Sequence, residues 1–239
     1  MIGAALYLMQ DSALFFPDNL PFDDCNRFPL GTDAIEFNGE RFFYKNNSDT
    51  LVIFYHGNAA SGCAWDFMGE IFDDKNLSYI ISVYPGFSGD ERSPSVENVK
   101  EYVEVLEKFA EQYDTVKLIG YSIGTGAAAY HSTLGDYKDL FFISSFPNIA
   151  EIARLQYPLY PVRHMLRDDF NIADYLHNFD GRVVQIHGKN DRIVPLKVGK
   201  MLFDLIGSDD KEFVEINQDH NTMFSDIVLF EELAEFLER

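Results

Sequence analysis

Short apolar runs are spaced along most of the chain. They cover residues 51–55, 79–83, 116–119, 140–143, 183–186 and 213–216. A strand that is covered on both faces has a nearly continuous apolar sequence of this length, whereas a half-exposed strand alternates apolar and polar residues. The runs therefore predict a mainly parallel sheet buried between two layers.

The pattern differs near the start of the chain. Asn38-Gly39 separates two β-prone runs, 34–37 and 41–44. A two-residue Asn-Gly connection between such runs is typical of a tight hairpin. We therefore expect the sheet to begin with an antiparallel pair of strands.

Between the apolar runs, hydrophobic residues recur every three or four positions, which predicts helices. These segments lie at 96–110, where Pro94 is a good first-turn residue, and at 198–205 and 227–237. The alternation predicts an α/β fold: about eight strands, helices on both faces and a single domain over residues 1–239. Residues 145–181 interrupt the pattern, and they fit either a small lid insertion or a crossover carrying a sheet-covering helix.

Composition excludes some partners and leaves others open. The formal net charge is −20, so nucleic-acid phosphates and anionic lipid headgroups would be repelled. No apolar run approaches the roughly 20 residues of a membrane span. Residues 1–9 are largely apolar, which fits either the end of a membrane anchor or a helix packed on the body. Oligomeric state is open.

The two cysteines, Cys25 and Cys63, form no metal-binding pattern. Reduced thiols in a cytoplasmic protein are the default expectation, and one disulfide is the alternative. Neither a metal nor a cofactor is expected.

The clearest chemical signal is Gly120-Tyr121-Ser122-Ile123-Gly124, which follows an apolar run and precedes a helix-like segment. A serine between glycines at a strand-to-helix turn is typical of a nucleophile elbow, in which strained backbone exposes the hydroxyl at the end of a sheet. Ser122 is therefore the candidate nucleophile. The alternative is an ordinary glycine-containing turn.

A serine hydroxyl needs a histidine to accept its proton and an acid to orient that histidine. Asp191 follows the run 183–186 and lies 69 residues after Ser122, and His220 lies 29 residues further on, past the last predicted strand. Both positions are expected to face the carboxyl edge of the sheet, beside Ser122. The neighbouring Asp219 is poorly placed to orient His220.

The remaining histidines receive no catalytic role. His56 and His187 lie in or beside apolar strands and are interpreted as packed structural residues. No motif surrounds His131, His164 or His177.

Attack on a carbonyl produces an oxyanion, which backbone N–H groups can stabilise. The residue after the nucleophile, Ile123, is expected to supply one donor. The loop His56-Gly57-Asn58-Ala59 follows a predicted strand, and its small residues favour inward-turned amides. Asn58 is the preferred second donor and Ala59 the next candidate.

The combination of 56–59, 84–89, 120–124, 188–195 and 219–221 resembles the serine hydrolases of the α/β-hydrolase fold. It is most similar to small, nearly capless members whose relatives include membrane-anchored protein depalmitoylases. The resemblance implies a triad of Ser122, Asp191 and His220, with Asn58 and Ile123 as oxyanion donors.

These features predict hydrolysis of a small carboxylic ester or acyl thioester through an acyl-enzyme on Ser122. Side chains of the 145–181 segment, Tyr157, Leu159, Tyr160 and Met165, are candidates for an acyl pocket, and plain core is the alternative interpretation. Two further functions stay open, a catalytically silent binding protein and a peptidase of the same fold. The predicted location is cytoplasmic, with membrane association through the N-terminus as a second possibility.

Overall fold

The computed structural model describes residues 14–18, 20–162, 165–166 and 169–239. The apolar stretch 1–9 and His164 lie outside the described residues. The chain divides into two compact units, with the boundary between Lys117 and Leu118. A single domain over 1–239 stays a prediction, and each unit is described by itself.

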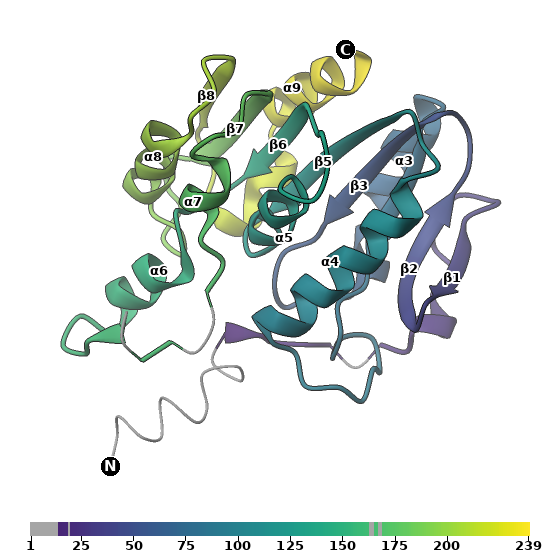
Figure 1. The fold of residues 1–239 in the computed structure, drawn as a ribbon, viewed down its shortest axis with the longest axis horizontal. Coiled ribbons are helices and arrows are strands. Elements are labelled where there is room, and N and C mark those ends of the chain that lie inside the picture. Colours follow the sequence, from purple (N-terminus) through teal and green to yellow (C-terminus); the bar gives the residue numbers. More distant parts are fainter. Residues whose placement is uncertain (1–13, 19, 163–164, 167–168) are drawn as a thin grey trace. The chain divides into compact units, whose positions relative to one another are not determined.

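The sheet has eight strands, with order β1-β2-β4-β3 through the first unit and β5-β6-β7-β8 through the second (Figure 1). Strands β1 and β2 are antiparallel, β3 and β4 are parallel, and β6, β7 and β8 are parallel. Helices cover both faces of the strands. The predicted fold class, an α/β-hydrolase sheet with an antiparallel start, is confirmed.

The strands begin and end close to the predicted runs. They are β1 (Asp33–Phe37), β2 (Glu40–Lys45), β3 (Thr50–Tyr55), β4 (Ser78–Ser82), β5 (Thr115–Tyr121), β6 (Asp139–Ile143), β7 (Arg182–Gly188) and β8 (Lys211–Ile216). Every residue of β7 is buried, including the polar Arg182, Gln185 and His187, as expected for a strand covered on both faces. At the hairpin, Asn38 and Gly39 have φ of 51° and 83°, the left-handed values that a tight β1–β2 turn requires.

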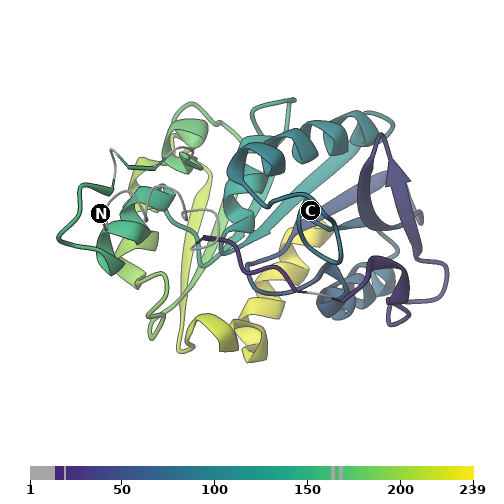
Figure 2. The ribbon, with the colours of Figure 1, turned by 90° about the horizontal axis from the view of Figure 1, so that it is seen from below.

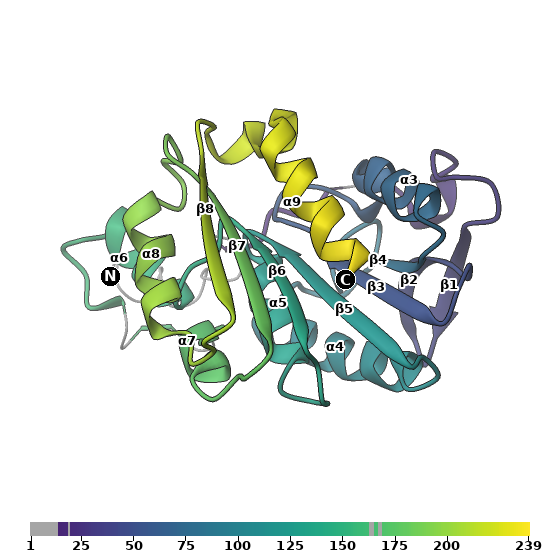
Figure 3. The same cartoon turned by 90° about the horizontal axis from the view of Figure 1, so that it is seen from above.

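In the first unit, α3 (Asp66–Asp74) and α4 (Val96–Ala110) lie on opposite faces of the strands (Figure 3). The 3-10 helices of this unit are η1 (Phe22–Asp24) and η2 (Gly62–Trp65). The periodicity at 96–110 is confirmed as α4, but Pro94 precedes the helix instead of lying in its first turn. Ser95 is the N-cap, and its hydroxyl accepts the Asn98 N–H at 3.1 Å.

The second unit contains α5 (Gly124–His131), α6 (Ile149–Gln156), α7 (Ile172–Leu176), α8 (Leu196–Leu205), η4 (His220–Ser225) and α9 (Ile227–Glu238). Figure 3 shows α9 on one face of β6 and α5 on the other. Within 145–181, α7 packs against α5 and α8, with Ile172 and Leu176 buried. Residues 157–161, in contrast, are mostly exposed. The two interpretations of residues 145–181, a small lid and a crossover carrying a sheet-covering helix, both stay predictions.

Residues 14–18 and 20–24, which are purple in Figure 2, are hydrogen-bonded to the loops that follow β3 and β4. The Phe16 N–H donates to the Asn58 side-chain oxygen at 2.9 Å. Asp18 accepts the Ser88 N–H at 3.3 Å, and the Phe22 N–H donates to the Ser88 carbonyl at 3.2 Å. This segment therefore holds both loops in place.

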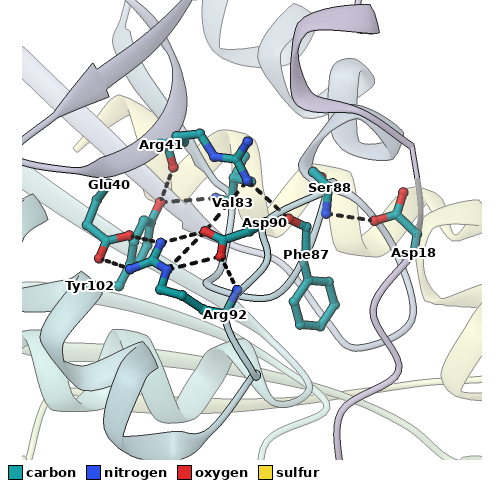
Figure 4. Close-up of polar contacts among 9 residues, drawn as sticks. All are labelled: Asp18, Glu40, Arg41, Val83, Phe87, Ser88, Asp90, Arg92 and Tyr102. Atoms are coloured by element: carbon teal, nitrogen blue, oxygen red, sulfur yellow. Dashed lines mark hydrogen bonds and ion pairs between the residues drawn. The ribbon is translucent and has the colours of Figure 1, made fainter.

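Ion pairs fix the loop after β4 (Figure 4). Arg92 forms a two-pronged pair with Glu40, at 2.5 and 2.7 Å, and also contacts Asp90 at 2.6 Å. Arg41 lies 3.6 Å from Asp90 and donates to the Phe87 carbonyl. Asp90 and Arg92 thus hold the loop to β2 through Arg41 and Glu40.

A disulfide joins Cys25 to Cys63, with their Cα atoms 5.7 Å apart. The expectation of two reduced thiols is therefore wrong. Each sequence neighbourhood looks like an ordinary loop, and the pairing arises because η1 and η2 fold against each other, 38 residues apart in the chain. A disulfide of this kind is unusual in reducing compartments, so cytoplasmic location stays a prediction.

Among the described residues, no helix has both the length and the apolar character of a membrane span.

Candidate active site

The turn after β5 has the strained backbone of a nucleophile elbow. Ser122 has φ of 53°, a left-handed value that costs energy in any residue with a Cβ. A Cβ on Gly120 would lie 2.6 Å from the Thr125 Cα, so only glycine allows strand and helix to approach this closely. The Ser122 carbonyl accepts the Thr125 N–H at 3.0 Å as α5 begins. The predicted elbow geometry is confirmed.

Asp191 lies in the turn after β7. Its Oδ1 atom accepts the backbone N–H groups of Ile193 at 2.9 Å and Val194 at 2.8 Å. These bonds fix the carboxylate and leave Oδ2 facing the loop that follows β8. Asp191 is 5 % exposed.

His220 is the first residue of η4, just past β8. Asp219 is the N-cap of η4, and its Oδ1 accepts the N–H groups of Asn221 at 2.9 Å and Thr222 at 3.1 Å. The Tyr121 hydroxyl donates to the His220 carbonyl at 2.7 Å. Asp219 thus caps the turn, which agrees with the prediction that it is poorly placed to orient His220.

The loops that carry Asp191 and His220 are joined through their backbones. The Asn190 N–H donates to the Gln218 carbonyl at 3.0 Å, and the Lys189 N–H donates to the Ile216 carbonyl at 2.8 Å. Relative movement of the two side chains would require these bonds to break.

Three side chains distant in sequence meet at the ends of β5, β7 and β8. His220 Nδ1 lies 2.7 Å from Asp191 Oδ2, and His220 Nε2 lies 3.0 Å from Ser122 Oγ. An ionised carboxylate only accepts, so Nδ1–H donates to Asp191, and Nε2 is left to accept the Ser122 proton. Ser122 is 9 % exposed. The residue as a whole is therefore largely buried, with its hydroxyl in contact with the His220 imidazole.

The electrostatics of Asp191 suit an ionised acid. Burial by itself would raise the pKa of the Asp191 carboxyl, but the hydrogen bond and charge of His220, with the Val194 N–H, outweigh it. The pKa therefore lies below its usual value. Asp191 stays ionised at neutral pH and can stabilise an imidazolium at His220.

The two predicted oxyanion donors lie in different units. Ile123 is the N-cap of α5, directly after Ser122. In the first unit, the Asn58 side chain is held by the Leu14 carbonyl, and the Ala59 N–H donates to Asn58 Oδ1 at 2.9 Å. That bond occupies Ala59, the second-choice donor. The roles of Asn58 and Ile123 stay predictions.

The four candidates for an acyl pocket differ in exposure. Leu159 is 92 % exposed and Tyr157 is 38 % exposed, whereas Tyr160 and Met165 are partly buried. All follow α6. Their role in binding an acyl chain stays a prediction.

The other described histidines occupy varied settings. His56 and His187 are fully buried, as predicted. His131 is also buried, with Nε2 2.9 Å from the Tyr137 hydroxyl, and His177 caps the end of α7.

Sequence reasoning missed Tyr121 as an anchor for the histidine loop. The available signal was the large polar side chain directly before Ser122, because a tyrosine at this position of the elbow can reach a neighbouring loop.

The described part of the chain contains no group of three or more His, Cys, Asp or Glu side chains arranged to hold a metal ion.

Comparisons with known proteins agree with the fold. No family model matches the sequence. An uncharacterized protein of Mycobacterium tuberculosis is 22% identical over 211 residues, covering 82% of this chain and 75% of that protein. A protein of Acanthamoeba polyphaga mimivirus, L404, whose name proposes an alpha/beta hydrolase, is 22% identical over 199 residues, covering 77% and 73%.

The solved structure of the Pyrococcus furiosus esterase Pf2001 is similar to this chain with a TM-score of 0.69. The match covers 94% of this chain and 98% of the esterase at 15% sequence identity. At this identity the likeness establishes the α/β-hydrolase fold.

Proposed function

We propose that the protein hydrolyses carboxylic esters or acyl thioesters through an acyl-enzyme on Ser122. The observation that carries the proposal is the continuous chain of contacts from Ser122 Oγ through the His220 ring to Asp191, at 3.0 and 2.7 Å. That chain supplies a nucleophile, a base and an orienting acid in hydrogen-bond contact. The esterase name of a structural neighbour supports the same reaction class.

In the first step, His220 Nε2 accepts the Ser122 proton as Oγ attacks the substrate carbonyl carbon. Asp191 stabilises the resulting imidazolium. The backbone N–H groups of Ile123 and Asn58 are the proposed donors to the oxyanion. His220 then returns the proton to the departing alcohol or thiol as its bond to the acyl carbon breaks.

In the second step, water replaces the lost leaving group. His220 takes a proton from the water, whose oxygen attacks the acyl carbon. The Ser122–acyl bond breaks, and His220 returns the proton to Ser122 Oγ. The carboxylic acid leaves and the enzyme is restored, with no cofactor required.

Two properties of the substrate separate the candidate classes: the length of the acyl chain, and an oxygen or sulfur atom in the leaving group. Leu159 and Tyr157 are exposed large apolar side chains, and with Tyr160 and Met165 they are the proposed contacts for an acyl chain. A panel of p-nitrophenyl esters and acyl thioesters of increasing chain length tests this. Preference for long acyl thioesters would favour the depalmitoylase-like branch, and activity limited to short oxygen esters would favour a general carboxylesterase.

A fluorophosphonate probe tests the proposed function directly, because it reacts with an activated serine and needs no knowledge of the substrate. We expect wild type and Asp219→Asn to be labelled, since asparagine is also a good N-cap, and Ser122→Ala to be unlabelled. Equal labelling of Ser122→Ala, or an unlabelled wild type, would support a silent binding protein or a different nucleophile.

A further inference from the structure

The buried ring of His187 lies directly behind the turn that holds Asp191. His187 is the penultimate residue of β7 and is fully buried. Its Nε2 atom lies 2.8 Å from the Val194 carbonyl oxygen. A carbonyl can only accept, so Nε2 carries the proton and donates.

Val194 is also the residue that fixes the carboxylate of Asp191. Its N–H donates to Asp191 Oδ1 at 2.8 Å, while its carbonyl accepts from His187. Both backbone groups of Val194 are therefore occupied, one by the acid and one by the buried histidine. The Val194 N–H binds Oδ1 of Asp191, which orients Oδ2 toward His220. A shift of Val194 would therefore disturb the orientation of the carboxylate.

The surroundings of His187 permit little movement. A Cβ added to Gly199 would lie 2.3 Å from His187 Nδ1, so the α8 backbone packs directly on this edge of the ring. Phe213 of β8 is stacked on its face, with an interplanar angle of 13°. Among the residues that the structure describes, none is a hydrogen-bond partner of the buried Nδ1 atom, and the ring's hydrogen bond is the one to the Val194 carbonyl.

We propose that His187 is a positioning residue for catalysis, holding the Asp191–Val194 turn so that the carboxylate faces His220. This inference rests on the proposed function, in which Asp191 orients the catalytic base. His187 touches neither substrate nor Ser122 in this role, and it acts only through Val194.

Neutrality of His187 is part of this arrangement. Burial is the largest influence on His187 and lowers its pKa, and the charge of His220 acts in the same direction. The Val194 carbonyl, the charge of Asp191 and the charge of Glu215, which lies opposite His187 on β8, act in the other direction and do not outweigh burial. His187 Nε2 lies 3.8 Å from Asp191 Oδ2. A charged ring there would compete with His220 for the carboxylate, whereas a neutral ring does not.

Two substitutions distinguish the hydrogen bond that His187 donates from the packing of its ring. His187→Gln keeps an N–H near the Nε2 position, and His187→Phe keeps a ring without a donor. His131→Phe is the matched control, because it removes another buried histidine of the same unit, one of whose contacts is with the Tyr137 hydroxyl. All variants are compared with wild type in kcat, KM and free energy of unfolding.

We expect kcat of His187→Phe to fall about 10- to 100-fold, the loss typical of a misplaced catalytic group, with KM within about twofold of wild type. His187→Gln should recover most of this loss. His131→Phe should keep kcat even if it is less stable. Wild-type kcat in His187→Phe, or an equal loss in His187→Gln, would overturn the proposal.

A proton NMR measurement keeps this test independent of activity. The His220 Nδ1–H bound to Asp191 should give a downfield resonance in wild type, His131→Phe and His187→Gln. That resonance should weaken or shift in His187→Phe. An unchanged resonance in His187→Phe would contradict the positioning role, whereas a change in a protein without esterase activity would support it and reject the proposed function.

Discussion

At the scale of single residues, the site depends on which atoms of each side chain are already occupied. Asp191 Oδ1 is bound by two backbone N–H groups, so only Oδ2 is available to His220. Asp219 is occupied by the first turn of η4. Two adjacent residues, Asp219 and His220, therefore make separate contacts, one with the backbone of η4 and the other with Asp191 and Ser122.

Asp191→Asn is expected to lower kcat by about 10⁴-fold, the loss seen when a triad acid becomes an amide and the histidine adopts the wrong tautomer. Steady-state kinetics on a p-nitrophenyl ester would measure it. Asp219→Asn is the matched control and should retain wild-type kcat. Equal losses in the two variants would mean that Asp191 has no special role.

His56 predicts a pH dependence of stability. Burial lowers the pKa of His56 from 6.5 to about 4, although the Gly57 carbonyl opposes this. The unfolded chain binds a proton near pH 6.5 and the folded chain does not. Stability is therefore complete above pH 6.5 and decreases as pH falls toward 4, by about 3 kcal/mol over this window.

Urea unfolding of wild type and His56→Gln between pH 7 and 4 would measure this contribution. Carboxylates also lose native contacts in acid, so the difference between the two proteins is the relevant quantity. A constant difference across the pH range would contradict the account of His56.

At the scale of elements, the sequence predicted the strands well because a buried parallel strand has a distinctive composition. The hairpin at Asn38-Gly39 and helices α4, α8 and α9 followed from local signals alone. The Cys25–Cys63 disulfide did not, because no local pattern records which loops meet in space. For the same reason, the hydrogen bond from Tyr121 to the His220 loop appeared only in the structure.

The disulfide is expected to stabilise the fold by closing a loop in the unfolded chain. Cys25 and Cys63 are 38 residues apart, for which loop closure predicts about 2–4 kcal/mol. Dithiothreitol should therefore lower the urea midpoint of wild type. The double variant Cys25→Ser with Cys63→Ser should have the urea midpoint of reduced wild type, and dithiothreitol should not change it. A wild-type midpoint that reduction leaves unchanged would contradict this prediction.

At the scale of the whole molecule, the fold could be predicted and the substrate could not. Ser122, Asp191 and His220 each follow a strand of one sheet, so the topology alone brings them to one edge. The burial of Ser122, and the contact of the buried His187 ring with the Val194 carbonyl behind the Asp191 turn, depend on three-dimensional packing that no motif encodes. The proposed acyl contacts after α6 rest on apolar character alone, which is a weak signal of function.

We propose that Ser122 forms a covalent acyl intermediate that His220 helps to form and hydrolyse. The most direct measurement is acid quenching during turnover of a p-nitrophenyl ester, followed by mass spectrometry of the digested protein. We expect one acyl adduct, on the side chain of Ser122, that is absent from Ser122→Ala. Turnover without an adduct on Ser122, or with the adduct on another residue, would contradict it.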